Sequence, residues 1–180
     1  MSAPRIAPGG LADVGCRTWL FSAAAGRVAR TAPPNLFLTL GRHRPLFRGW
    51  LRFAGRLMPG GKLPRHDTEL VILRVAHLRG CAYEFEHHRR LGRRAGVDPD
   101  RVRQGQASGG WSRRDRLVLA AVDQLHVACD LDDELWGELH AELGDAGMIE
   151  LVMLVGHYEM LATFIGTLRI APDAQRSIRD

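Results

Sequence analysis

Apolar residues recur every three or four positions along most of this chain, most clearly in residues 19–29, 46–58 and 145–168. This period is that of a helix with one buried face. No segment shows the apolar–polar alternation that is typical of a half-buried strand. The pattern therefore predicts an all-α fold.

Proline divides the N-terminal part of the chain. Pro33-Pro34 ends the first predicted helix, and a second helix begins near Asn35, a residue type that suits an N-cap. We predict a partly helical N-terminal extension over residues 1–33 and a helical domain over residues 34–180. The first fifteen residues contain proline and glycine without periodicity, so we expect them either to be mobile or to lie draped on a neighbour.

The segment 46–58 carries arginines on one side and an apolar stripe on the other. The stripe comprises Leu46, Trp50, Phe53, Ala54 and Leu57. Towards the C-terminus, Asp132 and Asp145 each suit the start of a separate helix. The second of these is a long apolar helix that runs to Leu168.

Two predicted helices meet at Gly80. Asp67 or Thr68 suits the N-cap of the first helix, Gly80 suits its C-terminal end, and the second helix runs to about Ala95. Helices joined by so short a turn are expected to pack antiparallel. Glu69 then lies about 16 Å before the turn and His88 about 12 Å after it, at 1.5 Å per residue. We expect these two side chains to be near neighbours.

The start of the second helix concentrates reactive side chains. Cys81, Glu84 and His88 fall within about 60° of one another at 100° per residue, whereas His87 points about 100° away from His88. A helix N-terminus favours a thiolate, but the Glu84 carboxylate opposes it by like-charge repulsion. The three groups are therefore interpreted as acid–base machinery, and the structural alternative is a buried cysteine beside a Glu–His pair.

The stretch from Asp67 through Gly80 and Cys81 to His88 resembles the carboxymuconolactone decarboxylase family, which includes the alkyl hydroperoxidase D proteins. The flanking segments 34–37 and 154–158 are similar to this family too. The resemblance implies an all-helical fold, a small-molecule substrate and assembly as trimers or multiples of trimers. Glu69, Cys81 and His88 match the family's site residues.

The chain departs from the peroxidase branch of that family at two positions. Glu84 replaces the second cysteine of the Cys-x-x-Cys pair, and Tyr83 replaces the histidine before it. A cycle that uses two neighbouring thiols therefore cannot run here. The decarboxylase branch acts by proton transfer without a cysteine pair, which is compatible with Glu84 and His88.

The resulting hypothesis is a decarboxylase-like enzyme with catalytic residues Glu69, Cys81, Glu84 and His88, acting on a small carbonyl or carboxylate compound. One alternative is a one-cysteine peroxidase that forms a sulfenic acid at Cys81. A second alternative is an oligomeric scaffold without catalysis.

Two acid-x-x-His elements, Glu84 to His87 and Asp123 to His126, raise the further alternative of a di-iron site, which would also need two more inward carboxylates. We assign no metal and no cofactor. His157 on the long C-terminal helix is interpreted as a core residue.

Composition and charge limit the other classes of function. Residues 1–66 carry a net charge of +10 (eleven basic residues and Asp13), and the rest carries −5 (fourteen basic and nineteen acidic). The basic residues do not form runs, so neither nucleic acid nor a membrane is expected as a partner. Three scattered cysteines argue against a disulfide framework, and a cytoplasmic location is expected.

Overall fold

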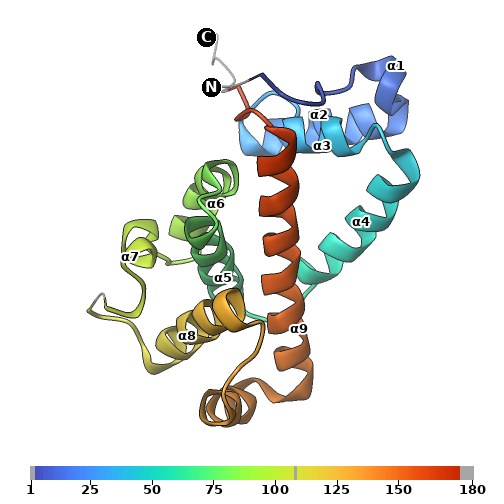
Figure 1. The fold of residues 1–180 in the computed structure, drawn as a ribbon. Helices are drawn as coiled ribbons and strands as arrows, with labels where there is room; N and C mark the ends of the chain where they lie inside the picture. Colours follow the sequence, from blue (N-terminus) through green and yellow to red (C-terminus); the bar gives the residue numbers. More distant parts are fainter. Residues whose placement is uncertain (1–2, 108, 175–180) are drawn as a thin grey trace. The chain divides into compact units, whose positions relative to one another are not determined.

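The computed structural model describes residues 3–107 and 109–174, and within these residues it contains helices and no strand, as the sequence predicts (Figure 1). The helices are α1 (Leu11–Val14), α2 (Cys16–Ala29), α3 (Asn35–Leu40), α4 (Arg44–Leu57), α5 (Arg65–Leu78), α6 (Ala82–Arg94), α7 (Pro99–Gln104), α8 (Arg113–Ala128) and α9 (Asp133–Leu168), with a 3₁₀ turn, η1 (Gly105–Ala107), after α7.

The chain forms two compact units. The first comprises Met1–Ala54 and Ile165–Asp180, and the second comprises Gly55–Phe164. The predicted boundary after residue 33 lies inside the first unit, where α2 and α3 contact each other on either side of it. All the candidate site residues lie in the second unit.

Four aromatic rings form a cluster in the first unit. Phe21, Phe37, Phe47 and Trp50 contact one another with ring centroids 5.6–6.2 Å apart. Phe47 is buried and Leu46 is exposed, so the start of the predicted apolar stripe is wrong by one position. The reason is tertiary, because the Phe47 ring reaches both Phe21 and Phe37.

Residues 3–15 lie against other segments of the first unit, and of the two arrangements expected for them this fits the second better. They contain α1, the Gly9 N–H donates to the Leu38 carbonyl at 3.1 Å, and the Arg5 N–H donates to the Leu168 carbonyl at 3.0 Å. Backbone hydrogen bonds to other segments of the first unit thus supply the order that local periodicity does not predict.

Helix α5 is the core of the second unit. It packs against α6, α7 and α8 and is buried on nearly its whole circumference, including Leu70, Ile72 and Leu73 (Figure 1). A helix that is apolar all round is enclosed by its neighbours. Carboxylates on such a helix must find partners within the protein.

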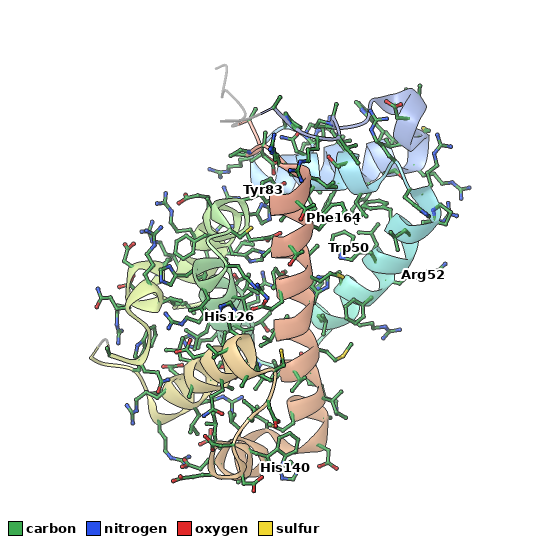
Figure 2. The ribbon with its side chains drawn as sticks, in the orientation of Figure 1. Trp50, Arg52, Tyr83, His126, His140 and Phe164 are labelled. Carbon is green, nitrogen blue, oxygen red and sulfur yellow. The ribbon has the colours of Figure 1, made fainter. Side chains whose placement is uncertain are left out.

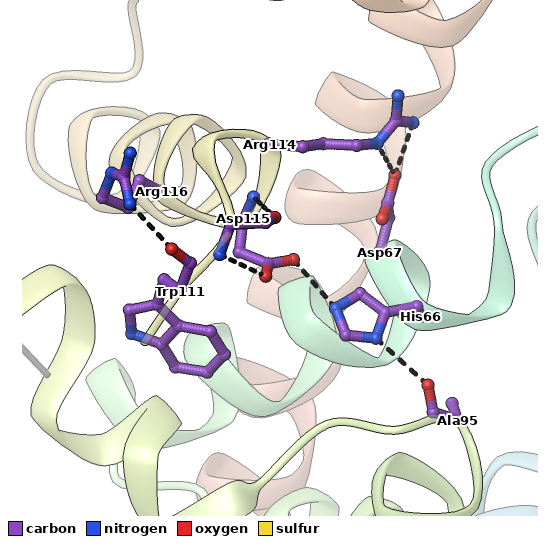
Figure 3. Close-up of polar contacts among 8 residues, drawn as sticks. His66, Asp67, Ala95, Trp111, Arg114, Asp115 and Arg116 are labelled. Carbon is purple, nitrogen blue, oxygen red and sulfur yellow. Dashed lines mark hydrogen bonds and ion pairs between the residues drawn. The ribbon is translucent and has the colours of Figure 1, made fainter. Parts of the chain in front are cut away.

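The predicted N-cap of α5 is wrong. The helix begins at Arg65, and Asp67 lies in its first turn, where it accepts hydrogen bonds from the guanidinium of Arg114 at 2.6 and 2.8 Å (Figure 3). His66 contacts Asp115 at 2.8 Å through Nε2 and the Ala95 carbonyl at 3.1 Å through Nδ1. These contacts join the start of α5 to α8 and to the end of α6, a use that sequence alone does not reveal.

Gly80 acts as predicted, and Gly144, for which the sequence predicts no role, makes a second break. Gly80 takes a φ of 58° after α5, in the left-handed region that ends helices. Gly144 takes φ 63° and ψ 177° inside α9, which separates the two helices predicted to start near Asp132 and Asp145. Among the described residues, α9 alone is long and apolar enough to span a bilayer, but half of its most apolar window is buried in the protein.

The burial of one face of α8 predicts that replacing two of its valines changes the free energy of unfolding by different amounts. Val122 is fully buried and Val127 is 84% exposed, both on the same helix. We expect Val122→Ala to lower the free energy of unfolding by about 1.5–3 kcal/mol and Val127→Ala to change it by less than about 0.5 kcal/mol. Urea unfolding measures both. Because the change in helix propensity is the same in each variant, equal effects would contradict the assignment.

The Asp115 contacts predict a loss of stability in acid. Burial acts to raise the pKa of Asp115, but hydrogen bonds from Ser112 and His66 outweigh it and lower the pKa below its usual value. A lowered pKa stabilises the fold above the unfolded value, about 3.9, and this contribution is lost as the pH falls through the folded value. Asp115→Asn is therefore expected to be less stable than the wild type at pH 7, with the gap narrowing below pH 4. Asp130→Asn, at an exposed position, is the control in the same urea titrations.

Candidate active site

The site is built around a buried Glu–His pair. His88 Nδ1 donates to Glu69 Oε2 at 2.9 Å, joining α6 to α5. Glu69 has no exposed surface and His88 is 3% exposed. This contact confirms the prediction that the packing of the two helices makes Glu69 and His88 near neighbours.

The second ring nitrogen of His88 faces two further groups. Glu84 Oε2 lies 3.5 Å from Nε2, and the Tyr158 hydroxyl lies 3.4 Å from it. The rings of His88 and Tyr158 are perpendicular, with centroids 5.5 Å apart. Glu84 and Tyr158 are also buried. Each nitrogen of the imidazole therefore faces a carboxylate, and Nε2 faces a phenol as well.

Arg65 supplies the positive charge at this site. Its guanidinium forms an ion pair with Glu69 Oε1 at 2.5 Å, one helical turn earlier on α5, and the side chain is 41% exposed. With His88 protonated, the charges of Arg65, Glu69, Glu84 and His88 sum to zero. Two buried carboxylates are thereby matched by two cations.

Cys81 is the N-cap residue of α6 and is buried. Burial raises the pKa of its thiol, and the Glu84 carboxylate raises it too, whereas hydrogen bonds from the backbone N–H groups of Glu84 and Tyr83 act in the opposite direction. The thiol is thus predominantly protonated near neutral pH. Geometry places Cys81 beside Glu84, but its environment is not that of an activated nucleophile.

Two further imidazoles, those of His87 and His157, contact the rings of His88 and Tyr158 and are neutral near pH 7. His87 packs edge-on to His88 with centroids 5.2 Å apart, and burial, the charge of His88 and that of Arg90 lower the pKa of His87 to about 4. His157 packs edge-on to Tyr158, and burial lowers the pKa of His157 to about 4. His157 is buried, in keeping with its interpretation as a core residue.

The two acid-x-x-His elements do not form a joint site. Asp123 accepts hydrogen bonds from Arg74 at 2.6 and 3.0 Å, and His126 contacts Glu159 at 2.6 Å (Figure 2 labels His126). Within residues 3–107 and 109–174, no three His, Cys, Asp or Glu side chains are grouped as metal ligands would be. The carboxylates and imidazoles of the two elements have separate partners.

Sequence reasoning missed Arg65 and Tyr158. Arg65 stands four residues before Glu69, a spacing typical of helical ion pairs, so its role could have been inferred. Tyr158 lies 70 residues after His88 in an apolar helix, and no local pattern indicates the contact.

Comparison with known proteins agrees with this architecture. Residues 44–123 match the model of the carboxymuconolactone decarboxylase family. A crystal structure described as an alkylhydroperoxidase AhpD core, an uncharacterized peroxidase-related protein from Ralstonia eutropha, has a TM-score of 0.84 at 17% identity and covers 98% of both chains. No curated protein matches the sequence.

Two further solved structures share the fold. An uncharacterized peroxidase-related protein from Silicibacter has a TM-score of 0.81 at 14% identity, again with 98% of each chain covered. The debrominase Bmp8 has a TM-score of 0.76 at 17% identity, with 95% of this chain and 93% of that chain covered. A cysteine-to-alanine variant of Bmp8 was crystallised with 2,3,4-tribromopyrrole. Residues 44–123 therefore match the carboxymuconolactone decarboxylase family, and the chain shares its fold with alkyl hydroperoxidase D-like structures.

Proposed function

We propose that this protein is an acid–base enzyme that transfers a proton to or from a small carboxylate- or carbonyl-bearing substrate through His88. The observation that carries the proposal is the His88 imidazole, buried with Glu69 at one nitrogen and Glu84 at the other. Glu69 accepts from Nδ1 in both protonation states of the ring, and Glu84 is placed to accept from Nε2 when that nitrogen is protonated. General acid–base catalysis requires a ring that gains and loses the Nε2 proton.

A decarboxylation illustrates the chemistry. The bond between the substrate carbon and its carboxylate breaks, CO₂ leaves, and the bonding electrons remain on carbon as an enolate. Protonated His88 then gives its Nε2 proton to that carbon, and the neutral imidazole regains a proton from solvent. Neither a metal nor a redox partner is needed to balance these steps.

Arg65 favours a substrate with negative charge. Its guanidinium is partly exposed, whereas the Glu69 carboxylate that it contacts is fully buried. A substrate carboxylate at the exposed side of this guanidinium would find a bidentate partner beside His88. We accordingly include a carboxylate in the proposed substrate.

A peroxidase based on Cys81 is the second candidate. Backbone N–H groups of Tyr83 and Glu84 point at the sulfur, which favours a thiolate at this helix start. Burial and the Glu84 charge outweigh that effect. The likeness to the peroxidase-related structures, at 14–17% identity, shows a common fold and does not transfer an activity.

The assembly and the setting of the enzyme also form part of the proposal. We expect a homo-oligomer, a trimer or a multiple of one, located in the cytoplasm. The support for the oligomer is an apolar face on α9, where Ile149, Met153 and Met160 are exposed in the single chain.

Replacing His88 tests the proton-transfer function. His88→Ala is expected to lower kcat/KM by about 100-fold or more, because the proton donor and acceptor is lost. The measurement is CO₂ release and deuterium uptake from D₂O with carboxymuconolactone and a panel of small keto and lactone carboxylates. His77→Ala, at an exposed position on α5, is the matched control. Full turnover by His88→Ala would rule out the proposed role.

Titration of the Cys81 thiol separates the two candidates. In a protein with Cys16 and Cys129 replaced by serine, we expect the alkylation rate of Cys81 to rise only above the ordinary thiol range, about pH 8.5. Glu84→Gln is expected to move this midpoint lower, since a like charge is removed. Glu86→Gln, an exposed carboxylate on the same helix, is the control. A midpoint well below pH 8, with faster peroxide reduction than by a free thiol, would favour the peroxidase.

A further inference from the structure

Nε2 of His88 has two partners of opposite hydrogen-bonding character. The Tyr158 hydroxyl, 3.4 Å away, is able to donate a proton in a hydrogen bond, whereas the Glu84 carboxylate, 3.5 Å away, only accepts. The two distances are nearly equal. Neutral His88 therefore has a donor available at Nε2, and protonated His88 has an acceptor.

Tyr158 is held as a donor. Its ring stands perpendicular to that of His88, and its side chain is buried on α9. Burial raises the pKa of the Tyr158 hydroxyl well above its usual value, and the charges of Glu84 and Glu69 raise it further. The phenol therefore keeps its proton throughout the neutral range and does not take the proton of His88.

We propose that Tyr158 is a positioning residue that stabilises neutral His88 as the Nδ1–H tautomer, so that Nε2 is the basic nitrogen, while Glu84 stabilises the protonated ring. This inference rests on the proposed proton transfer through His88. Tyr158 and Glu84, which lie outside the Glu69–His88 pair, then have opposite effects on the protonation equilibrium of the His88 ring.

The other groups around His88 do not reproduce this pair of effects. From α5, Glu69 accepts the Nδ1 proton in both states and Arg65 neutralises Glu69. From α6, His87 contacts the ring, and from α9, His157 contacts Tyr158; both are neutral above about pH 5, because their pKa values are about 4. Among residues 3–107 and 109–174, Glu84 and Tyr158 are the side chains placed to distinguish the two states at Nε2.

During catalysis the proton count is conserved. A proton that Nε2 takes from a substrate carbon forms an N–H that donates to Glu84, and the Tyr158 hydroxyl releases Nε2 without losing its own proton. When Nε2–H gives its proton to carbon, the phenol resumes its hydrogen bond to the bare nitrogen. Tyr158 thus orients the base without becoming charged.

The test is a titration of the His88 ring by ¹⁵N NMR, assigned by comparison with His88→Gln. In Tyr158→Phe we expect the midpoint to rise by about half to one pH unit, since neutral His88 loses a hydrogen bond worth about 0.5–1.5 kcal/mol. In Glu84→Gln we expect it to fall, because the protonated ring loses its charged acceptor. Thr163→Val, which removes a hydroxyl from the next turns of α9, is the control.

The tautomer and the pH–rate profile complete the test. Wild-type neutral His88 is expected to show Nδ1–H signals only, and Tyr158→Phe is expected to shift the acid limb of kcat/KM in the same direction as the NMR midpoint. An unchanged midpoint in Tyr158→Phe, or shifts of the same sign in both variants, would overturn the inference. Full activity of His88→Ala would instead overturn the proposed function, even with the NMR shifts as expected.

Discussion

The burial of Glu69 is the constraint on which the rest of this site depends. A carboxylate without exposed surface, on a helix enclosed by three others, is stable only if nearby groups compensate its charge. Arg65 supplies one partner within α5, and His88 supplies the other from α6. Removing one partner of such a buried pair costs about 3–5 kcal/mol. The Glu69–His88 contact therefore both stabilises the pairing of α5 with α6 and orients the His88 ring.

That constraint also defines what each group in the site is able to do. Glu69 fixes Nδ1 of His88 as a donor, which leaves Nε2 as the nitrogen whose proton can be exchanged. The Glu84 carboxylate lies on that side, 3.5 Å from Nε2. Its charge raises the pKa of Cys81. One carboxylate therefore favours a protonated imidazole and disfavours a thiolate.

Local rules predicted the parts of the structure that depend on local interactions. The all-α fold, the turn at Gly80 and the break before Asp145 follow from periodicity and from glycine in the left-handed region. The Glu69–His88 contact followed too, because a short turn leaves two helices only one way to pack. Errors arose where distant side chains decide: Asp67 pairs with Arg114 of α8 instead of capping α5, and Tyr158 reaches His88 from 70 residues away.

Glu84 stands at the position where the peroxidase branch resembled by this sequence has its second cysteine, and electrostatics explains why this change favours one chemistry over the other. A thiol peroxidase needs a thiolate at Cys81, and a carboxylate one turn away works against it. Acid–base catalysis by His88 needs a buried acceptor at Nε2, and a cysteine thiol is a weak one. The same substitution that hinders the first reaction supports the second. Glu84 and a single buried cysteine therefore fit the proposed proton transfer better than they fit a thiol peroxidase.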